Sequence, residues 1–130
     1  MIADTSFLID IMKSHKDAIK KAEELEKKGN TIAVTSISIF KLFIGVSLSI
    51  KQDQERNKIN RILNGLWIIS FDEGSAREAG MIFAQKRKNG STIEPEDSKI
   101  AGICSRRDEI LITRNIKHFC DIEGLRIESY

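Results

Sequence analysis

Two polar clusters could carry chemistry, because each stands where a short apolar run predicts that a β-strand ends. Asp4-Thr5-Ser6 follows the run Met1 to Ala3, and Thr113-Arg114-Asn115 ends the run that begins at Glu109. In open parallel sheets the working crevice lies beyond the carboxyl ends of the strands. An aspartate after a strand is often only a helix cap, but here Thr5 or Ser6 can take that role. The pattern therefore leaves the Asp4 carboxylate free for other work.

A third acidic residue, Asp97, stands on the apolar side of a predicted helix. Asp97, Ile100, Ala101 and Cys104 follow the i, i+3, i+4, i+7 spacing of one helix face. A carboxylate on an inward face is costly unless it is paired or binds a metal. The alternative is that Asp97 only opens the helix, where its charge favours the helix dipole.

Lys41 is the unusual residue of the predicted helix Ile37 to Ile50. At 100° per residue it falls in a stripe with Ile37, Ile44 and Leu48, flanked by Phe40. An unpaired ammonium in such a stripe is expensive, so Lys41 must reach solvent or pair with buried carboxylates. Asp4 and Asp97 are the obvious partners. The opposite side of the helix is also apolar (Ile39, Phe43, Val46 and Ile50), which predicts either a subunit interface or contact with a neighbouring helix.

The elements that must position these residues alternate between short apolar runs and longer amphipathic ones, as in an α/β protein with a parallel sheet. The remaining predicted strands are Thr31 to Val34, Leu66 to Ser70 and Leu125 to Glu128. The remaining predicted helices are Ser6 to Met12, Lys16 to Lys28, Gln52 to Asn64, Asp72 to Lys88 and Glu94 to Arg107. The sequence thus predicts one three-layer α/β domain over residues 1–130, with a central, mostly parallel five-stranded sheet flanked by helices.

Composition favours a soluble domain. Of 130 residues, 41% are hydrophobic and 31% are charged, and the net charge of +2 is too small to indicate nucleic-acid binding by itself. The longest apolar run is far short of the roughly 20 residues that span a bilayer. Met1 to Ile11 carries two aspartates and no basic residue, unlike a signal peptide, so a cytoplasmic location without membrane contact is expected. Cys104 and Cys120 have no metal-ligand spacing, and Cys104 is predicted to be a core residue.

At these positions the chain resembles the PIN-domain family, and specifically its VapC toxin branch. Four short motifs carry the resemblance, in order and at family spacing across nearly the full chain. They are Ile2-Ala3-Asp4-Thr5-Ser6-Phe7-Leu8-Ile9-Asp10, the stretch from Thr35 to Val46, the stretch from Ile93 through Asp97 to Ala101, and Leu111-Ile112-Thr113-Arg114-Asn115 with His118-Phe119. The tail Gly124 to Glu128 also fits.

The resemblance implies a metal-dependent endoribonuclease of a toxin–antitoxin pair. Asp4 and Asp97 match positions that hold Mg²⁺ or Mn²⁺, which prefer hard oxygen ligands. Such an ion activates water and stabilises charge on the attacked phosphate. Thr113 and Asn115 match the fourth motif, where Asn115 stands at an often acidic place, and Asp121 could add a further carboxylate.

Lys41 departs from the family pattern, which normally has glutamate at this position. Lysine carries no acceptor for a metal, and its ammonium would compete with a cation for Asp4 and Asp97. The hypothesis is that this chain binds metal poorly and has impaired activity. The alternative is that Lys41 points away and leaves the site working.

The resemblance also implies two protein partners, a second copy in a homodimer and a small antitoxin whose C-terminal segment lies across the active-site groove. RNA would be drawn by Arg114 and Lys117, with a wider basic rim of Lys86, Arg87, Lys88, Arg106 and Arg107.

Two other function classes compete with a toxin ribonuclease. One is an inactive PIN domain that binds antitoxin or RNA without cutting, and Lys41 is the feature that separates the two. The other is a receiver domain, which needs an acceptor aspartate after its third strand, whereas Asp72 has the pattern of a helix cap. His15 and His118 are predicted to be surface residues without a catalytic role.

Overall fold

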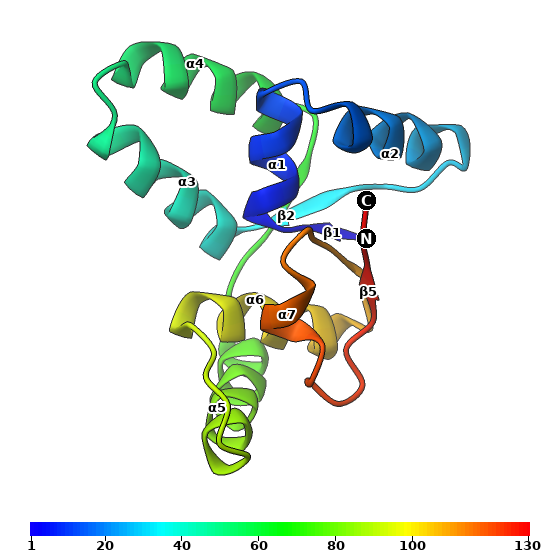
Figure 1. Cartoon of the computed structure of the whole chain (residues 1–130), viewed down its shortest axis with the longest axis vertical. Coiled ribbons are helices and arrows are strands. Elements are labelled where there is room, and N and C mark those ends of the chain that lie inside the picture. The colour runs from blue at the N-terminus through cyan, green and yellow to red at the C-terminus, as the bar shows by residue number, and fades with distance from the viewer.

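Short apolar runs form the strands of a five-stranded sheet in the computed structural model, which describes residues 1–130 (Figure 1). All neighbouring strands are parallel and their order is β3-β2-β1-β4-β5, so the predicted mostly parallel sheet is parallel throughout. The strands are β1 (Ile2–Ala3), β2 (Ala33–Thr35), β3 (Trp67–Ile69), β4 (Leu111–Ile112) and β5 (Ile127–Glu128). The helices are α1 (Thr5–Met12), α2 (Lys16–Lys27), α3 (Ser36–Leu48), α4 (Gln52–Leu63), α5 (Glu73–Lys88), α6 (Pro95–Arg107) and α7 (Ile116–Phe119).

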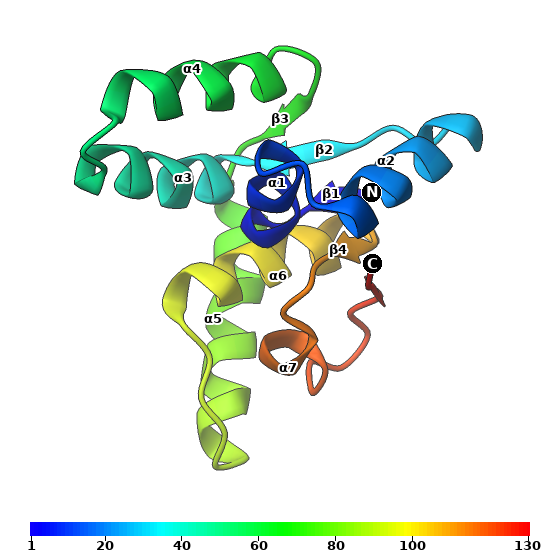
Figure 2. The same cartoon turned by 45° about the horizontal axis from the view of Figure 1, so that its top comes forward.

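The sheet lies between two helical layers, which confirms the three-layer prediction. In Figures 1 and 2, α1 to α4 lie on one side of the sheet and α5, α6 and α7 on the other. Successive residues of a strand point to opposite faces of the sheet, so β1 and β4 each contribute side chains to both hydrophobic cores. Ile2 and Leu111 pack under α5 and α6, whereas Ala3 and Ile112 pack under α1 to α4. No helix combines the length and apolar character that crossing a membrane would require.

Side-chain caps begin two of the helices where the sequence predicts them. Thr35 Oγ1 accepts a hydrogen bond from Ser38 N at the start of α3, and Asp72 Oδ1 accepts one from Ser75 N at the start of α5. Asp4 is the residue before α1, yet its carboxylate makes no capping hydrogen bond. The carboxylate is therefore available elsewhere, as the sequence predicts.

Helix α3 settles the alternatives for its two apolar sides. Val46 is buried, and Ile39 and Phe43 pack against the same core, so that side is core and not a subunit interface. The Lys41 side is the more open one, because Ile44 is 45% and Leu48 81% exposed. Ile50 lies beyond the end of the helix and is exposed.

Helices α5 and α6 pack closely because Gly102 has no side chain. A Cβ atom at Gly102 would lie 2.7 Å from both Ala79 N and Ser75 O. This close approach holds α6 against α5, as Figure 2 shows, and fixes the helix that carries Asp97.

Candidate active site at the carboxyl edge of the sheet

The two polar clusters of the sequence meet at one point of this edge. Ala3 pairs with Ile112 in the parallel ladder, so Asp4 and Thr113 leave the sheet side by side. Thr113 Oγ1 donates to Asp4 Oδ2 over 2.8 Å, and Ser6 Oγ donates to the same oxygen over 2.9 Å. All three side chains are buried. The sequence predicts both polar clusters at this edge, and the pairing of β1 with β4 brings Asp4 and Ser6 of one into contact with Thr113 of the other.

The second carboxylate oxygen of Asp4 has a different environment. Asp4 Oδ1 is buried and accepts no hydrogen bond from the protein. A buried acceptor without a partner costs free energy, so this oxygen calls for a donor or cation from outside the chain. Asp4 Oδ1 is thus the carboxylate oxygen of the site that is free to accept a ligand.

Asp97 lies in the first turn of α6 and points inward, as its helical spacing predicts. It is 3% exposed, and both of its oxygens are engaged by side chains of other helices. Oδ1 accepts from Lys41 Nζ at 2.7 Å, and Oδ2 accepts from His118 Nδ1 at 2.8 Å. Asp97 is therefore a paired buried charge and not only a residue that opens its helix.

Lys41 pairs with one of its two predicted partners, Asp97. Its ammonium contacts Asp97, with 30% of the side chain exposed, and no contact joins it to Asp4. The alternative that Lys41 points away from the site is wrong. Its ammonium has three donors, and Asp97 is the only acceptor that the chain gives them.

His118 lies at the surface, as the sequence predicts, but its ring also contacts Asp97, which the sequence did not predict. The four-residue helix α7, which periodicity did not predict, turns the ring toward Asp97 while its neighbour Phe119 is buried. Half of the His118 side chain is exposed. The hydrogen bond through Nδ1 leaves Nε2 directed away from Asp97. The available signal was that His118, with Phe119, forms part of the fourth motif.

A third buried carboxylate, Asp10, was not predicted from the sequence to take part in the site. Arg114 Nη1 donates to both oxygens of Asp10, at 2.9 and 2.7 Å, and the Tyr130 hydroxyl donates to Oδ2 at 2.8 Å. Burial and the bond to Asp10 raise the pKa of the Tyr130 phenol well above its usual range. The backbone N–H of Arg114 donates to Ser6 Oγ at 3.2 Å, so this network adjoins the Asp4 cluster.

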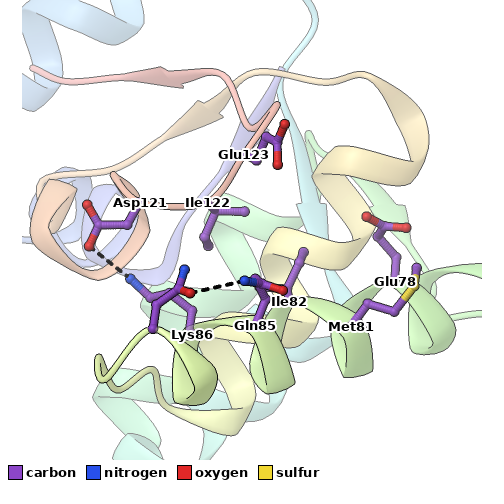
Figure 3. A pocket seen from close by; sticks show the side chains of 9 residues that line it. Glu78, Met81, Ile82, Gln85, Lys86, Asp121, Ile122 and Glu123 are labelled. Atoms are coloured by element: carbon purple, nitrogen blue, oxygen red, sulfur yellow. Dashed lines mark hydrogen bonds and ion pairs between the residues drawn. The ribbon is translucent and has the colours of Figure 1, made fainter.

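The remaining predicted residues divide into those at the edge and those away from it. Asn115 lies beside Thr113, donating its backbone N–H to Thr113 Oγ1 at 3.0 Å, and Lys117 is exposed on α7. Asp121 lies elsewhere. It faces a cavity of about 390 Å³ between α5 and the segment before β5, where its Oδ2 is 3.4 Å from Lys86 Nζ (Figure 3).

The prediction that Lys86 belongs to an exposed basic rim is wrong. The residue is 3% exposed and its ammonium points toward Asp121 (Figure 3). Its burial follows from its place on the inner side of α5. Lys86 therefore belongs to a structural ion pair and not to the surface that could meet RNA.

The donor set at the edge does not fit a divalent ion as it stands. Both oxygens of Asp97 and one of Asp4 already accept hydrogen bonds, which leaves Asp4 Oδ1 as the open carboxylate oxygen. No three His, Cys, Asp or Glu side chains converge as a metal site requires. The ammonium of Lys41 occupies the Asp97 oxygen that a metal ion would otherwise bind. Metal binding at Asp4 and Asp97 stays a prediction, and so does its weakening by Lys41.

Comparisons with known proteins agree with this geometry. The PIN domain family model matches residues 1–125. Ribonuclease VapC2 of Rickettsia felis is 32% identical over 127 residues, which are 98% of this chain and 95% of that protein. The tRNA(fMet)-specific endonuclease VapC of Salmonella typhimurium is 25% identical over the same shares of the two chains.

Solved structures give the same result in three dimensions. VapBC2 from Rickettsia felis, bound to a DNA fragment from its promoter, superposes with a TM-score of 0.90 and 31% identity, covering 99% of this chain and 97% of that one. DNA-bound VapBC from Salmonella typhimurium gives 0.87 and 25% identity, covering 98% and 96%. The chain therefore belongs to the PIN-domain family and, within it, to the VapC group.

Proposed function

We propose that this chain is the toxin partner of a cytoplasmic toxin–antitoxin pair, that its site acts on RNA phosphodiester bonds, and that Lys41 impairs cleavage. The observation that carries the proposal is the ion pair between Lys41 and Asp97 beside the Asp4–Thr113 cluster. The relatives are named ribonucleases, which supports RNA as substrate. The edge keeps the hydroxyls and carboxylates of such a site, but a lysine holds one of its carboxylates.

RNA contacts would come from cations at the rim of this edge. Arg114 is half exposed, and Asp10 holds its guanidinium by one nitrogen, so the other nitrogens can meet a phosphate. Lys117 is exposed on the short helix that also carries His118. Phosphate contacts of this kind position the strand without reading its sequence.

An antitoxin segment fits the groove next to Lys41. A cavity of about 370 Å³ runs between α1, α3 and α4, with apolar walls that include Met12 and Val46. Lys41 lies at its boundary, so a segment in the groove would end at the site. Structures of relatives are complexes of toxin with antitoxin, which supports such a partner.

A homodimer is the second expected assembly. The exposed side of α3 presents Phe40, Ile44 and Leu48, which a soluble monomer would leave in water. We propose this side as the region that a second copy or the antitoxin covers.

A binding protein without nuclease activity is the second candidate function, and the Lys41–Asp97 pair favours it as well. The test is an RNA cleavage assay in Mg²⁺ and in Mn²⁺ with the chain, Lys41→Glu, and Lys41→Glu combined with Asp4→Ala. Lys41→Glu restores a third carboxylate beside Asp97, and we expect it alone to cut. The double variant should be inactive because Asp4 is then lost.

The outcomes separate the two functions. Cleavage by Lys41→Glu alone supports an impaired ribonuclease. Equal cleavage by the chain and Lys41→Glu contradicts the impairment, and failure of both on total RNA and on tRNA favours the binding protein. Circular dichroism of each variant establishes that it is folded.

A further inference from the structure

Lys41 changes the charge of the site by as much as a divalent ion would. A lysine in place of a glutamate raises the local charge by two units, from minus one to plus one, and Mg²⁺ also contributes two. The site with Asp4, Asp97 and the ammonium of Lys41 therefore has the net charge that three carboxylates and one Mg²⁺ would have. The lysine thus gives the site, without a metal, the same net charge that a bound Mg²⁺ would give it with a glutamate at position 41.

The geometry supports the same role. Asp97 fixes the ammonium over 2.7 Å, and the bond from His118 holds the carboxylate from its other side. The Lys41 side chain is 30% exposed, so its free donors are accessible to a ligand. A cation that a carboxylate holds in place and that keeps free N–H donors can bind a phosphate.

We propose that Lys41 replaces the divalent cation of this site, so that the site binds an RNA phosphate directly and without metal. The ligand class rests on the proposed function, whereas the independence from metal rests on the Lys41–Asp97 pair. The phosphate oxygen takes a free N–H of Lys41. Arg114, held by Asp10, contacts a neighbouring phosphate.

The test measures binding and not cleavage. The probe is a fluorescein-labelled, mixed-sequence RNA whose 2′-hydroxyls are all methylated, so that no variant can cut it by attack from that group. Fluorescence anisotropy in EDTA gives Kd for the chain, for Lys41→Met and for Lys41→Arg. Lys20→Met is the matched control, because Lys20 is an exposed lysine on α2 and its loss changes the net charge equally.

The chain is expected to bind in EDTA, with Lys41→Met weaker by about tenfold and Lys20→Met within about twofold. Lys41→Arg should retain most of the affinity, because it keeps the positive charge and the N–H donors. The slope of log affinity against log salt should fall by roughly one for Lys41→Met. Equal binding by the chain and Lys41→Met in EDTA overturns the proposal, as does binding by the chain only in the presence of metal.

Thermal unfolding gives a second readout that does not involve RNA. The midpoint of the chain should not move in Mg²⁺ or Mn²⁺ at constant ionic strength, whereas Lys41→Glu should rise, because a bound ion stabilises the folded state. A rise for the chain equal to that of Lys41→Glu contradicts replacement of the ion by Lys41. Cleavage by Lys41→Glu tests the proposed function separately, so either idea can fail while the other stands.

Discussion

Breaking the ion pair between Lys41 and Asp97 should cost stability, and the double variant should lose less than the two single variants lose together. The atoms are 2.7 Å apart, with 4% of the Asp97 side chain and 30% of the Lys41 side chain exposed. Exposed pairs contribute at most about 1 kcal/mol, and loss of one partner of a buried pair costs about 3–5 kcal/mol. This pair is buried on one side only. A coupling free energy of about 2 kcal/mol is therefore expected.

The assay is a double-mutant cycle of Lys41→Met, Asp97→Asn and both changes together. Lys41→Met keeps most of the aliphatic stem and leaves the buried carboxylate with His118 alone. Urea unfolding is followed by circular dichroism, because the single tryptophan, Trp67, is exposed and reports poorly on the core. For a domain of this length, a loss of about 2 kcal/mol lowers the melting temperature by roughly 8 °C.

The result that would refute the reasoning is additivity. If the losses in free energy of unfolding caused by the two single changes, each measured relative to the chain, sum to the loss in the double variant within about 0.5 kcal/mol, the ammonium and the carboxylate do not interact. Persistence of the coupling in 1 M NaCl would instead identify a pair that solvent ions do not screen.

Three further predictions follow from single residues. Absorbance at 295 nm reports the only tyrosine, Tyr130, and should show the phenol titrating above its usual pKa of 10 in the native chain and near 10 in urea. The free energy of unfolding should then fall as pH rises above 10, because the folded state holds the phenol proton more tightly than the unfolded state does. A native pKa near 10 would contradict the buried hydrogen bond. Gly102→Ala should cost about 1–3 kcal/mol because its Cβ has no room, whereas Gly80→Ala, in open space on α5, should gain about 0.5–1 kcal/mol; thermal melts that rank them in the reverse order would contradict the close approach of α5 and α6. Burial raises the pKa of the Cys104 thiol to about 12, so a thiol reagent should modify exposed Cys120 rapidly and Cys104 only on unfolding, and two fast thiols would contradict the core placement.

The sequence by itself determined the layers, the strand ends and the place of Asp4 and Thr113 at the carboxyl edge of the sheet, whereas the structure decided that β1 and β4 are neighbours and that the two residues meet. Apolar runs of strand length, separated by amphipathic helices, leave few alternatives to a parallel sheet. In such a sheet, residues that follow adjacent strands must meet at one edge. Helical spacing likewise placed Asp97 inward, and Lys41 was recognised as a charge in need of a partner. These conclusions depend on local periodicity, which short stretches of chain encode.

Only the tertiary structure decided which charges pair. Lys41 forms an ion pair with Asp97 and not with Asp4. Asp10 accepts hydrogen bonds from Arg114 and Tyr130, and Lys86 is buried in an ion pair with Asp121. Most of these partners lie on elements distant in sequence, and their contacts depend on how helices cross and which rotamers the packing allows. His118 shows the limit most clearly, because a helix of four residues is too short for periodicity to reveal. Its contact with Asp97 exists only because α6 and α7 pack at the same edge of the sheet.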